Sequence, residues 1–180
     1  LNVASASIDK MRANQEINDI ILALGCGTGR EFKVADLRYE RIIIMTDADV
    51  DGAHIASLLM TFFYRQMPSL IDNGHLYLAV PPLYRVAKGG DTAYARDDAD
   101  LKHLLDTRFK GGKTEISRFK GLGEMPARQL KETTMAPETR TLLRVAVEPG
   151  SRLLVAERVE TLMGKRPEKR FQFIQENARF

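Results

Sequence analysis

The sequence predicts an α/β protein with a parallel sheet flanked by helices and a helical C-terminal tail. An apolar strand spans residues 41–46, a strong helical pattern follows residue 52, and a second strand spans residues 75–80. Strand, helix and strand within about 40 residues is the pattern of a right-handed βαβ unit. The first strand contains a continuous apolar run, as expected for a strand covered on both faces of a parallel sheet.

End signals define the helices of this first part of the chain. Asn14 and Gly25 are good start and stop signals for one helix, and residues 25–38 read as a loop. Pro68 suits the first turn of a short helix that Gly74 closes. Apolar residues recur at helical spacing at Ile17, Ile20, Ile21 and Leu24, and again at Ile55, Leu58, Leu59, Phe62 and Phe63.

The second part of the chain predicts a hairpin, one further strand and several helices. The stretch "PPLYRVAKGGDTAYAR" reads as a hairpin that turns at Lys88–Asp91. Leucines at 101, 104 and 105 indicate a helix, and Pro149–Gly150 marks a boundary. The remaining expected elements are a strand over Thr114–Phe119, a helix after Pro126, and closing helices over Leu153–Met163 and Glu168–Asn177.

Composition limits the classes of function. The chain has 180 residues, is 44% hydrophobic and carries a formal net charge of +3, which is compatible with nucleic acid without indicating it. Its single cysteine, Cys26, excludes a disulfide framework within the chain and suits a reducing cytosol. The longest uncharged run, Gly52 to Tyr64, is too short to span a bilayer, and no signal peptide is recognisable.

Three aspartates at alternate positions directly after the apolar strand are the main functional signal. Asp47, Asp49 and Asp51 would point to one side of an extended chain, about 6.5 Å apart. Their repulsion is costly unless a cation compensates it, and hard carboxylate ligands suit Mg²⁺ or Ca²⁺. The simpler interpretation is an acidic turn with Asp51 as N-cap and Gly52 easing the bend. In open α/β sheets, ligands bind beyond the carboxyl ends of the strands, which is where these residues lie.

Three functions use such a pattern. An EF-hand-like calcium module shares D-x-D-x-D-G, but its twelfth position here is Leu58 and a strand precedes the loop. An aspartyl phosphatase presents D-x-D after a strand, but needs a further acidic pair, for which Asp97–Asp98 is the only doublet. Metal-assisted phosphoryl transfer on nucleic acid also fits. The stretch "RFKGLGEM" favours phosphoryl transfer. Arg118 and Lys120 could pair with phosphates, while Gly121 and Gly123 let the backbone approach a nucleic-acid strand closely.

The motifs "TDADVDGAHI", "PPLYRV" and "RFKGLGEM", in this order and spacing, resemble the Toprim region of the B subunits of bacterial type IIA topoisomerases, DNA gyrase and topoisomerase IV. The resemblance covers essentially the whole chain. "MRANQEI", "HIASLL" and "SRFKGLGEM" look more like topoisomerase IV than gyrase. The resemblance implies a Toprim (Rossmann-like) fold: residues 1–110 form the metal-binding core with a hairpin insertion, and residues 111–180 form the KGLGEM loop and a helical tail packed on the core.

The resemblance also implies a mechanism. The enzyme would cut and reseal double-stranded DNA, driven by ATP, with a tyrosine of the A subunit as nucleophile in an A₂B₂ assembly in the cytoplasm, associated with the nucleoid. Asp47 and Asp49 would hold Mg²⁺, with Mn²⁺ or Ca²⁺ as substitutes, and Asp51 would contribute directly or through water. The implied DNA contacts are His54, Arg118, Lys120, Gly121 and Gly123, and Asn14 and Glu16 match positions that face the cleaved DNA and quinolone drugs.

One departure from the family pattern concerns the metal site. The family's fourth acid is a Glu of an "EGDSA" motif that precedes "LNV", and neither it nor the ATP-binding domain is within these 180 residues. The chain is therefore expected to be a fragment that is inactive alone.

Overall fold

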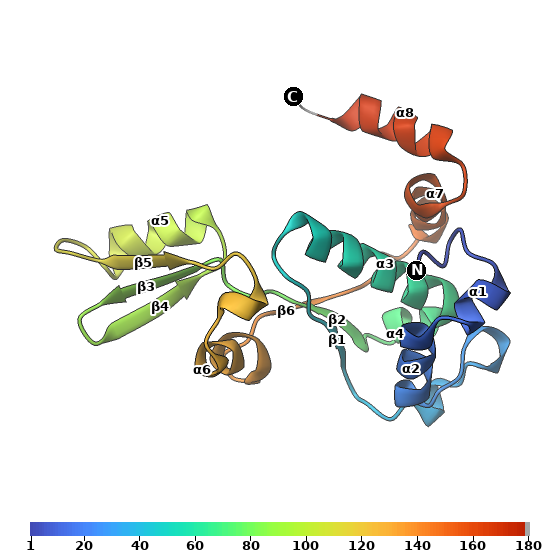
Figure 1. Cartoon of the computed structure of the whole chain (residues 1–180), viewed down its shortest axis with the longest axis horizontal. Helices are drawn as coiled ribbons and strands as arrows, with labels where there is room; N and C mark the ends of the chain where they lie inside the picture. Colours follow the sequence, from blue (N-terminus) through green and yellow to red (C-terminus); the bar gives the residue numbers. More distant parts are fainter. Residues whose placement is uncertain (179–180) are drawn as a thin grey trace. The chain divides into compact units, whose positions relative to one another are not determined.

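The computed structural model describes residues 1–178 and has the expected α/β architecture (Figure 1). Its residues fall into two compact units. The first unit holds Leu1–Ile42, Ser57–Tyr77 and the chain from Arg144 onward, and the second holds Ile43–Ala56 and Leu78–Leu143. The division at residue 110 that the sequence suggests stays a prediction.

A three-stranded sheet has the order β1-β2-β6, with β1 at Ile42–Ile44, β2 at Leu76–Ala79 and β6 at Leu142–Arg144. The helices α3 (Val50–Gln66) and α4 (Pro68–Asp72) connect β1 to β2, the kind of long connection that parallel neighbours require. The third strand, β6, was not predicted. It runs antiparallel to β2, because Val80 N–H donates to the Thr141 carbonyl while Val145 N–H donates to the Leu76 carbonyl.

The first unit contains the N-terminal helices and the helical tail. Helix α1 spans Ile8–Arg12 and α2 spans Gln15–Leu24, followed by short 3₁₀ turns at Gly29–Glu31 and Val34–Asp36. The predicted end signals of α2 are confirmed: the Asn14 side chain accepts from Ile17 N–H, and Gly25 is left-handed at φ 71°. The buried core of this unit contains Ile17, Leu24, Phe62, Phe63, Met67, Leu70, Ile71 and Leu76.

The tail helices are α7 (Arg152–Met163) and α8 (Pro167–Asn177), close to the predicted bounds. Helix α7 is joined to α3 by Arg65, which donates to the Glu160 carboxylate at 2.8 Å, and to α4 by Arg152, which donates to Asp72 at 2.5 Å. Helix α8 is linked to α7 by the Arg158 guanidinium, 4.6 Å from the Phe173 ring centre. Among the described residues, no helix is long and apolar enough to cross a membrane.

The second unit is built on the predicted hairpin. Strands β3 (Tyr84–Lys88) and β4 (Asp91–Ala95) pair antiparallel with Lys88 opposite Asp91, and β5 (Glu115–Arg118) pairs on the other edge of β3. Helix α5 (Asp98–Thr107) lies along this sheet (Figure 1). Its leucines at 101, 104 and 105 pack on a core of Val86, Ala93 and Phe109.

The chain after β5 carries the "RFKGLGEM" motif. It forms a 3₁₀ turn at Leu122–Glu124, α6 at Ala127–Leu130 and a π-helical turn at Lys131–Met135. Pro126 stands at the N-cap of α6, as expected for a residue that opens a helix. Buried Phe119 and Met125 hold the two ends of the motif, while Lys120 and Gly123 are exposed.

Candidate metal centre

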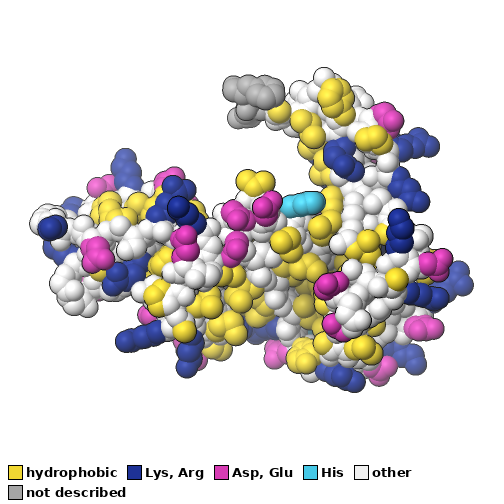
Figure 2. Space-filling view, viewed as in Figure 1, with side chains coloured by type: hydrophobic (Ala, Val, Ile, Leu, Met, Phe, Trp, Pro, Cys, Tyr) yellow, Lys and Arg dark blue, Asp and Glu magenta, His cyan; other side chains and the backbone are white. Residues whose placement is uncertain are grey.

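The aspartate motif changes conformation part-way through. Asp47 follows β1 in non-helical backbone, the chain bends at Ala48 and Asp49, and α3 begins at Val50. The three aspartates therefore do not alternate along one extended segment, and the even spacing expected from the sequence is wrong. All three side chains are exposed, and acidic side chains gather near the start of α3 on the face seen in Figure 2.

The helix cap is Asp49, which corrects the expectation that Asp51 has this role. The Asp49 carboxylate accepts from Gly52 N–H at 2.7 Å, and its carbonyl accepts from Ala53 N–H at 3.0 Å. This is the usual N-cap arrangement, which satisfies a donor that has no partner within the helix. Asp51 lies inside the first turn, where its negative charge also suits the helix dipole.

Gly52 is buried and is required by the backbone of Asp47. A Cβ atom on Gly52 would lie 2.1 Å from the Asp47 carbonyl oxygen and 2.8 Å from its carbon. No side chain fits at that distance. The glycine after the third aspartate therefore allows the start of α3 to fold back tightly against Asp47, instead of easing a bend before the helix.

The Asp47 side chain contacts the second motif directly. Its Oδ1 accepts from Leu122 N–H at 2.7 Å. A Cβ atom on Gly121 would lie 3.1 Å from the Asp47 Cγ and 3.2 Å from each of its carboxylate oxygens. Two motifs about 75 residues apart in sequence thus meet at one carboxylate, within a single compact unit. The sequence placed both motifs in one function, but it contained no sign that Leu122 N–H would be the link.

The donor set suits a hydrated hard cation. The described residues contain no group of three or more His, Cys, Asp or Glu side chains arranged to hold a metal ion. Mg²⁺, however, is commonly bound by one or two carboxylates and retains several waters. Asp47 and Asp49 each use one carboxylate oxygen to accept from a backbone N–H, and both residues are exposed. The loop therefore fits an open, water-rich divalent site and does not fit a closed cage of three carboxylates.

Arg118 of the second motif lines a pocket of about 270 Å³. Arg118 is exposed, with its guanidinium 5.8 Å from the Tyr84 ring centre, and Lys120 is exposed with its N–H donated to the Glu124 carboxylate. Arg85 and Gln129 also line the pocket, and sequence reasoning missed both. The sequence signal for Arg85 was its place in the motif "PPLYRV", where it directly follows Tyr84. Tyr84 is the residue whose ring the Arg118 guanidinium contacts.

The other candidate residues have simpler surroundings. Asn14 caps α2, so the capping interpretation is confirmed, and Glu16 is exposed in the first turn of that helix. Their proximity to cleaved DNA or drug stays a prediction. His54 is exposed in the N-terminal part of α3 and belongs to the same compact unit as the aspartates.

The Asp97–Asp98 doublet has structural partners. Asp97 caps α5 by accepting from Asp100 N–H at 2.8 Å, and Asp98 accepts from the Tyr84 hydroxyl at 2.5 Å. The hydrogen bond to Asp98 raises the pKa of Tyr84, with burial as the second cause. The EF-hand arrangement is also absent, because strand β1 precedes the motif and α3 begins at its fourth position.

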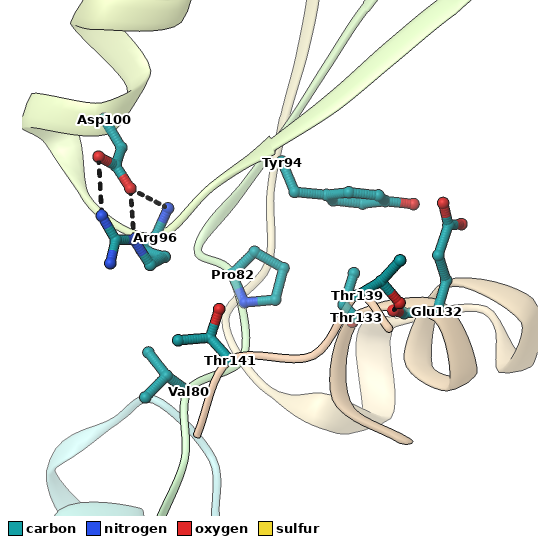
Figure 3. Close-up of a pocket in the computed structure, with 9 residues that line it drawn as sticks. All are labelled: Val80, Pro82, Tyr94, Arg96, Asp100, Glu132, Thr133, Thr139 and Thr141. Carbon is teal, nitrogen blue, oxygen red and sulfur yellow. Dashed lines mark hydrogen bonds and ion pairs between the residues drawn. The ribbon is translucent and has the colours of Figure 1, made fainter. Parts of the chain in front are cut away.

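A second hollow of about 260 Å³ lies between β4, the π-helical turn and the segment before β6 (Figure 3). The Arg96 Nε donates to Asp100 at 2.6 Å, and this ion pair lowers the pKa of Asp100. The Tyr94 hydroxyl points toward Glu132, and burial followed by the Glu132 charge raises the pKa of Tyr94. Its charged groups thus have partners within the hollow, and we assign it no catalytic role.

Comparison with known families agrees with this geometry. Residues 1–81 match the model of the Toprim domain, and residues 107–175 match that of the carboxyl terminus of the DNA gyrase B subunit. The chain belongs to the Toprim region of the bacterial type IIA topoisomerase B subunits. The Toprim match contains the aspartate motif, and the gyrase B match contains the "RFKGLGEM" motif.

This chain is similar to the B subunit of DNA topoisomerase 4 from Caulobacter vibrioides, with 66% identity over 180 residues. The match covers 100% of this chain and 26% of that protein. It is 64% identical to the B subunit of DNA topoisomerase 4 from Bartonella bacilliformis, with the same coverage of each chain. It is 53% identical to the B subunit of DNA gyrase from Halalkalibacterium halodurans, covering 100% of this chain and 28% of that protein. The expected order, topoisomerase IV first and gyrase next, is confirmed, and the chain spans about a quarter of the length of these relatives.

Proposed function

We propose that this chain is the Mg²⁺-binding part of an ATP-dependent type IIA DNA topoisomerase, of the topoisomerase IV kind. Together with the A subunit's tyrosine, the whole enzyme would cleave and religate double-stranded DNA. The observation that carries the proposal is the hydrogen bond from Leu122 N–H to Asp47 at 2.7 Å. It brings the Asp47 carboxylate of one motif against the backbone of the other, whose basic residues Arg118 and Lys120 are exposed.

The chain's own residues supply the ligands. Asp47 and Asp49 would each offer the carboxylate oxygen that is not held by a backbone N–H, and Asp51 would act directly or through water. When bound, Mg²⁺ would supply Lewis-acid stabilisation of charge at the scissile phosphate and the 3′-oxygen. Mn²⁺ or Ca²⁺ would occupy the same oxygen ligands.

The second motif would hold DNA. Arg118 and Lys120 are exposed and would pair with phosphates, and His54 is exposed on the same compact unit to donate to another. A Cβ atom on Gly123 would meet nothing within 4 Å, so a DNA strand could approach the backbone there. Such contacts release counterions, so binding should weaken steeply with salt.

The partners follow from the family. Double-stranded DNA and the A subunit would complete the site in an A₂B₂ assembly, located in the cytoplasm with the nucleoid. None of the chain's five tyrosines would attack DNA, and ATP would bind in another part of the whole B subunit. The 180-residue chain alone should therefore neither cleave nor relax DNA.

The test is Asp47→Ala in the full-length protein, assayed with its A subunit. We expect Mg²⁺-dependent double-strand cleavage to be lost, because one of the two proposed direct ligands is gone, while ATP hydrolysis is retained. Asp106→Ala is the matched control, since Asp106 is an exposed helical aspartate in the same unit and away from the motifs. Wild-type cleavage by the Asp47 variant would refute the assignment.

The phosphatase alternative is tested separately. It requires the isolated chain to hydrolyse p-nitrophenyl phosphate, with turnover removed by Asp47→Asn. We expect no turnover, because the only acidic doublet is used for a helix cap and a tyrosine contact.

A further inference from the structure

We propose that Gly121 and the backbone N–H of Leu122 position the Asp47 carboxylate for the divalent ion. The proposal rests on the function proposed above. It assigns to the second motif a role in the metal site itself, in addition to any contact with DNA.

The hydrogen bond defines which oxygen is available. Leu122 N–H donates to Asp47 Oδ1 at 2.7 Å, which leaves Oδ2 for a ligand. Carboxylates that bind metals are commonly oriented by such a bond to their second oxygen, and removing the orienting group weakens metal binding. The donor is the backbone N–H of Leu122, so the type of side chain at position 122 does not indicate that this hydrogen bond exists.

Gly121 provides the space that this orientation needs. Its backbone has φ −163° and ψ 172°, an extended conformation that any residue adopts. Glycine is therefore not required there for its conformational freedom. A Cβ atom would lie 3.1 Å from Asp47 Cγ and 3.2 Å from each oxygen, closer than nine in ten real Cβ contacts. An alanine would push the carboxylate away by a few tenths of an ångström.

Gly123, two residues later, differs in this respect. A Cβ atom on Gly123 would meet nothing within 4 Å, and its φ lies outside the left-handed region. The two glycines of one motif thus have different surroundings: one faces a proposed metal ligand, and the other faces open space. The chain supplies a matched pair of Gly→Ala changes that separates an effect on Asp47 from a general effect on the loop.

The experiment compares Gly121→Ala and Gly123→Ala in the full-length, nucleotide-free protein. Mn²⁺ is the probe, and its binding is followed by electron paramagnetic resonance of the free ion. We expect Gly121→Ala to weaken Mn²⁺ binding by about 10-fold or more, the usual effect of losing an orienting group. Gly123→Ala should bind Mn²⁺ like the wild type, whatever its effect on DNA. In the assembled enzyme, Gly121→Ala should raise the Mg²⁺ concentration needed for half-maximal cleavage.

Leu122→Pro tests the hydrogen bond and covers the case in which Gly121→Ala does not fold. Leu122 is the first residue of the 3₁₀ turn, where proline is well tolerated because that N–H has no partner within the turn. Gly121 already has the extended backbone that a following proline requires. The substitution removes the donor to Asp47 and should weaken Mn²⁺ binding, with circular dichroism showing that the fold is retained.

Asp47→Ala, measured in the same way, separates this inference from the proposed function. If Asp47→Ala binds Mn²⁺ like the wild type, the metal is not held by Asp47 and the proposed function fails. If Asp47→Ala loses binding while Gly121→Ala and Leu122→Pro match the wild type, the function stands and the positioning role is refuted.

Discussion

Gly52→Ala is the substitution for which the structure gives the clearest magnitude. The new Cβ would lie 2.1 Å from the Asp47 carbonyl oxygen, well inside the 3.0 Å that real Cβ atoms keep. The obstacle is backbone on both sides, so either Asp47 or the first turn of α3 must move by about 1 Å. Forcing extra volume into a tight site costs at most about 3 kcal/mol in typical cases, and a backbone obstacle places this site near that limit.

Helix propensity offsets part of this cost. Alanine is about 1 kcal/mol more favourable than glycine inside a helix, and Gly52 lies within α3. The expected net loss in the free energy of unfolding is therefore about 2 kcal/mol. For a chain of this size, that loss corresponds to a fall in Tm of about 4 to 8 °C.

Thermal unfolding followed by far-UV circular dichroism measures the effect. Gly90→Ala is the control, because Gly90 has open space around it and a φ outside the left-handed region, so its change should stay within about 0.5 kcal/mol. A Gly52→Ala protein that unfolds at or above the wild-type temperature would show that α3 does not begin against Asp47. Weaker Mn²⁺ binding should accompany the loss of stability, since the Asp47 backbone moves.

Two further predictions concern the second unit. Phe109→Ala should lower the free energy of unfolding by about 4 kcal/mol, because Phe109 is 3% exposed and fills the core between α5 and the hairpin. Chemical denaturation measures this loss. A loss below about 1 kcal/mol would contradict the packing. Asp91→Asn should reduce the dependence of stability on acid pH. The hydrogen bond from Arg108 holds the pKa of Asp91 below its usual value, so the stabilisation is present above the unfolded pKa and is lost as pH falls through the folded pKa. Thermal scans across acid pH compare the variant with the wild type, and identical acid dependence would show that the Asp91–Arg108 pair is not formed in solution.

Elements with local signals were predictable from the sequence. Asn14 and Gly25 mark the ends of α2 by capping chemistry, and the Gly89–Gly90 pair marks the hairpin turn. Strand β6 was missed because it has only three residues and two of them are exposed, so it carries no alternation of apolar and polar positions. The start of α3 was placed late because Val50 is 85% exposed and gives no apolar signal for a first turn.

The site was predictable in its residue types and not in its geometry. Alternating carboxylates indicated a cation, but their spacing was worked out for an extended chain, whereas the backbone turns into a helix within the motif. The contact between Asp47 and Leu122 has no local signature, because it depends on how two segments far apart in sequence fold together. The π-helical turn at Lys131–Met135 likewise follows no period that single-sequence reasoning tests.

Because β3 is the central strand of the hairpin sheet, its pairing with β5 fixes where the second motif begins. Strand β5 is fixed in register by β3, with Arg118 opposite Tyr84, and the chain reaches Gly121 only three residues later. A slip of one residue in that pairing would move the loop by about 3.3 Å along the strand and reverse its faces, which would take Leu122 N–H away from Asp47. Insertions at the exposed Gly89–Gly90 turn leave this register unchanged, whereas one added residue between Glu115 and Gly121 alters it. Insertions and deletions should therefore be tolerated at the tip of the hairpin and should not be tolerated between Glu115 and Gly121, the segment that leads to Leu122.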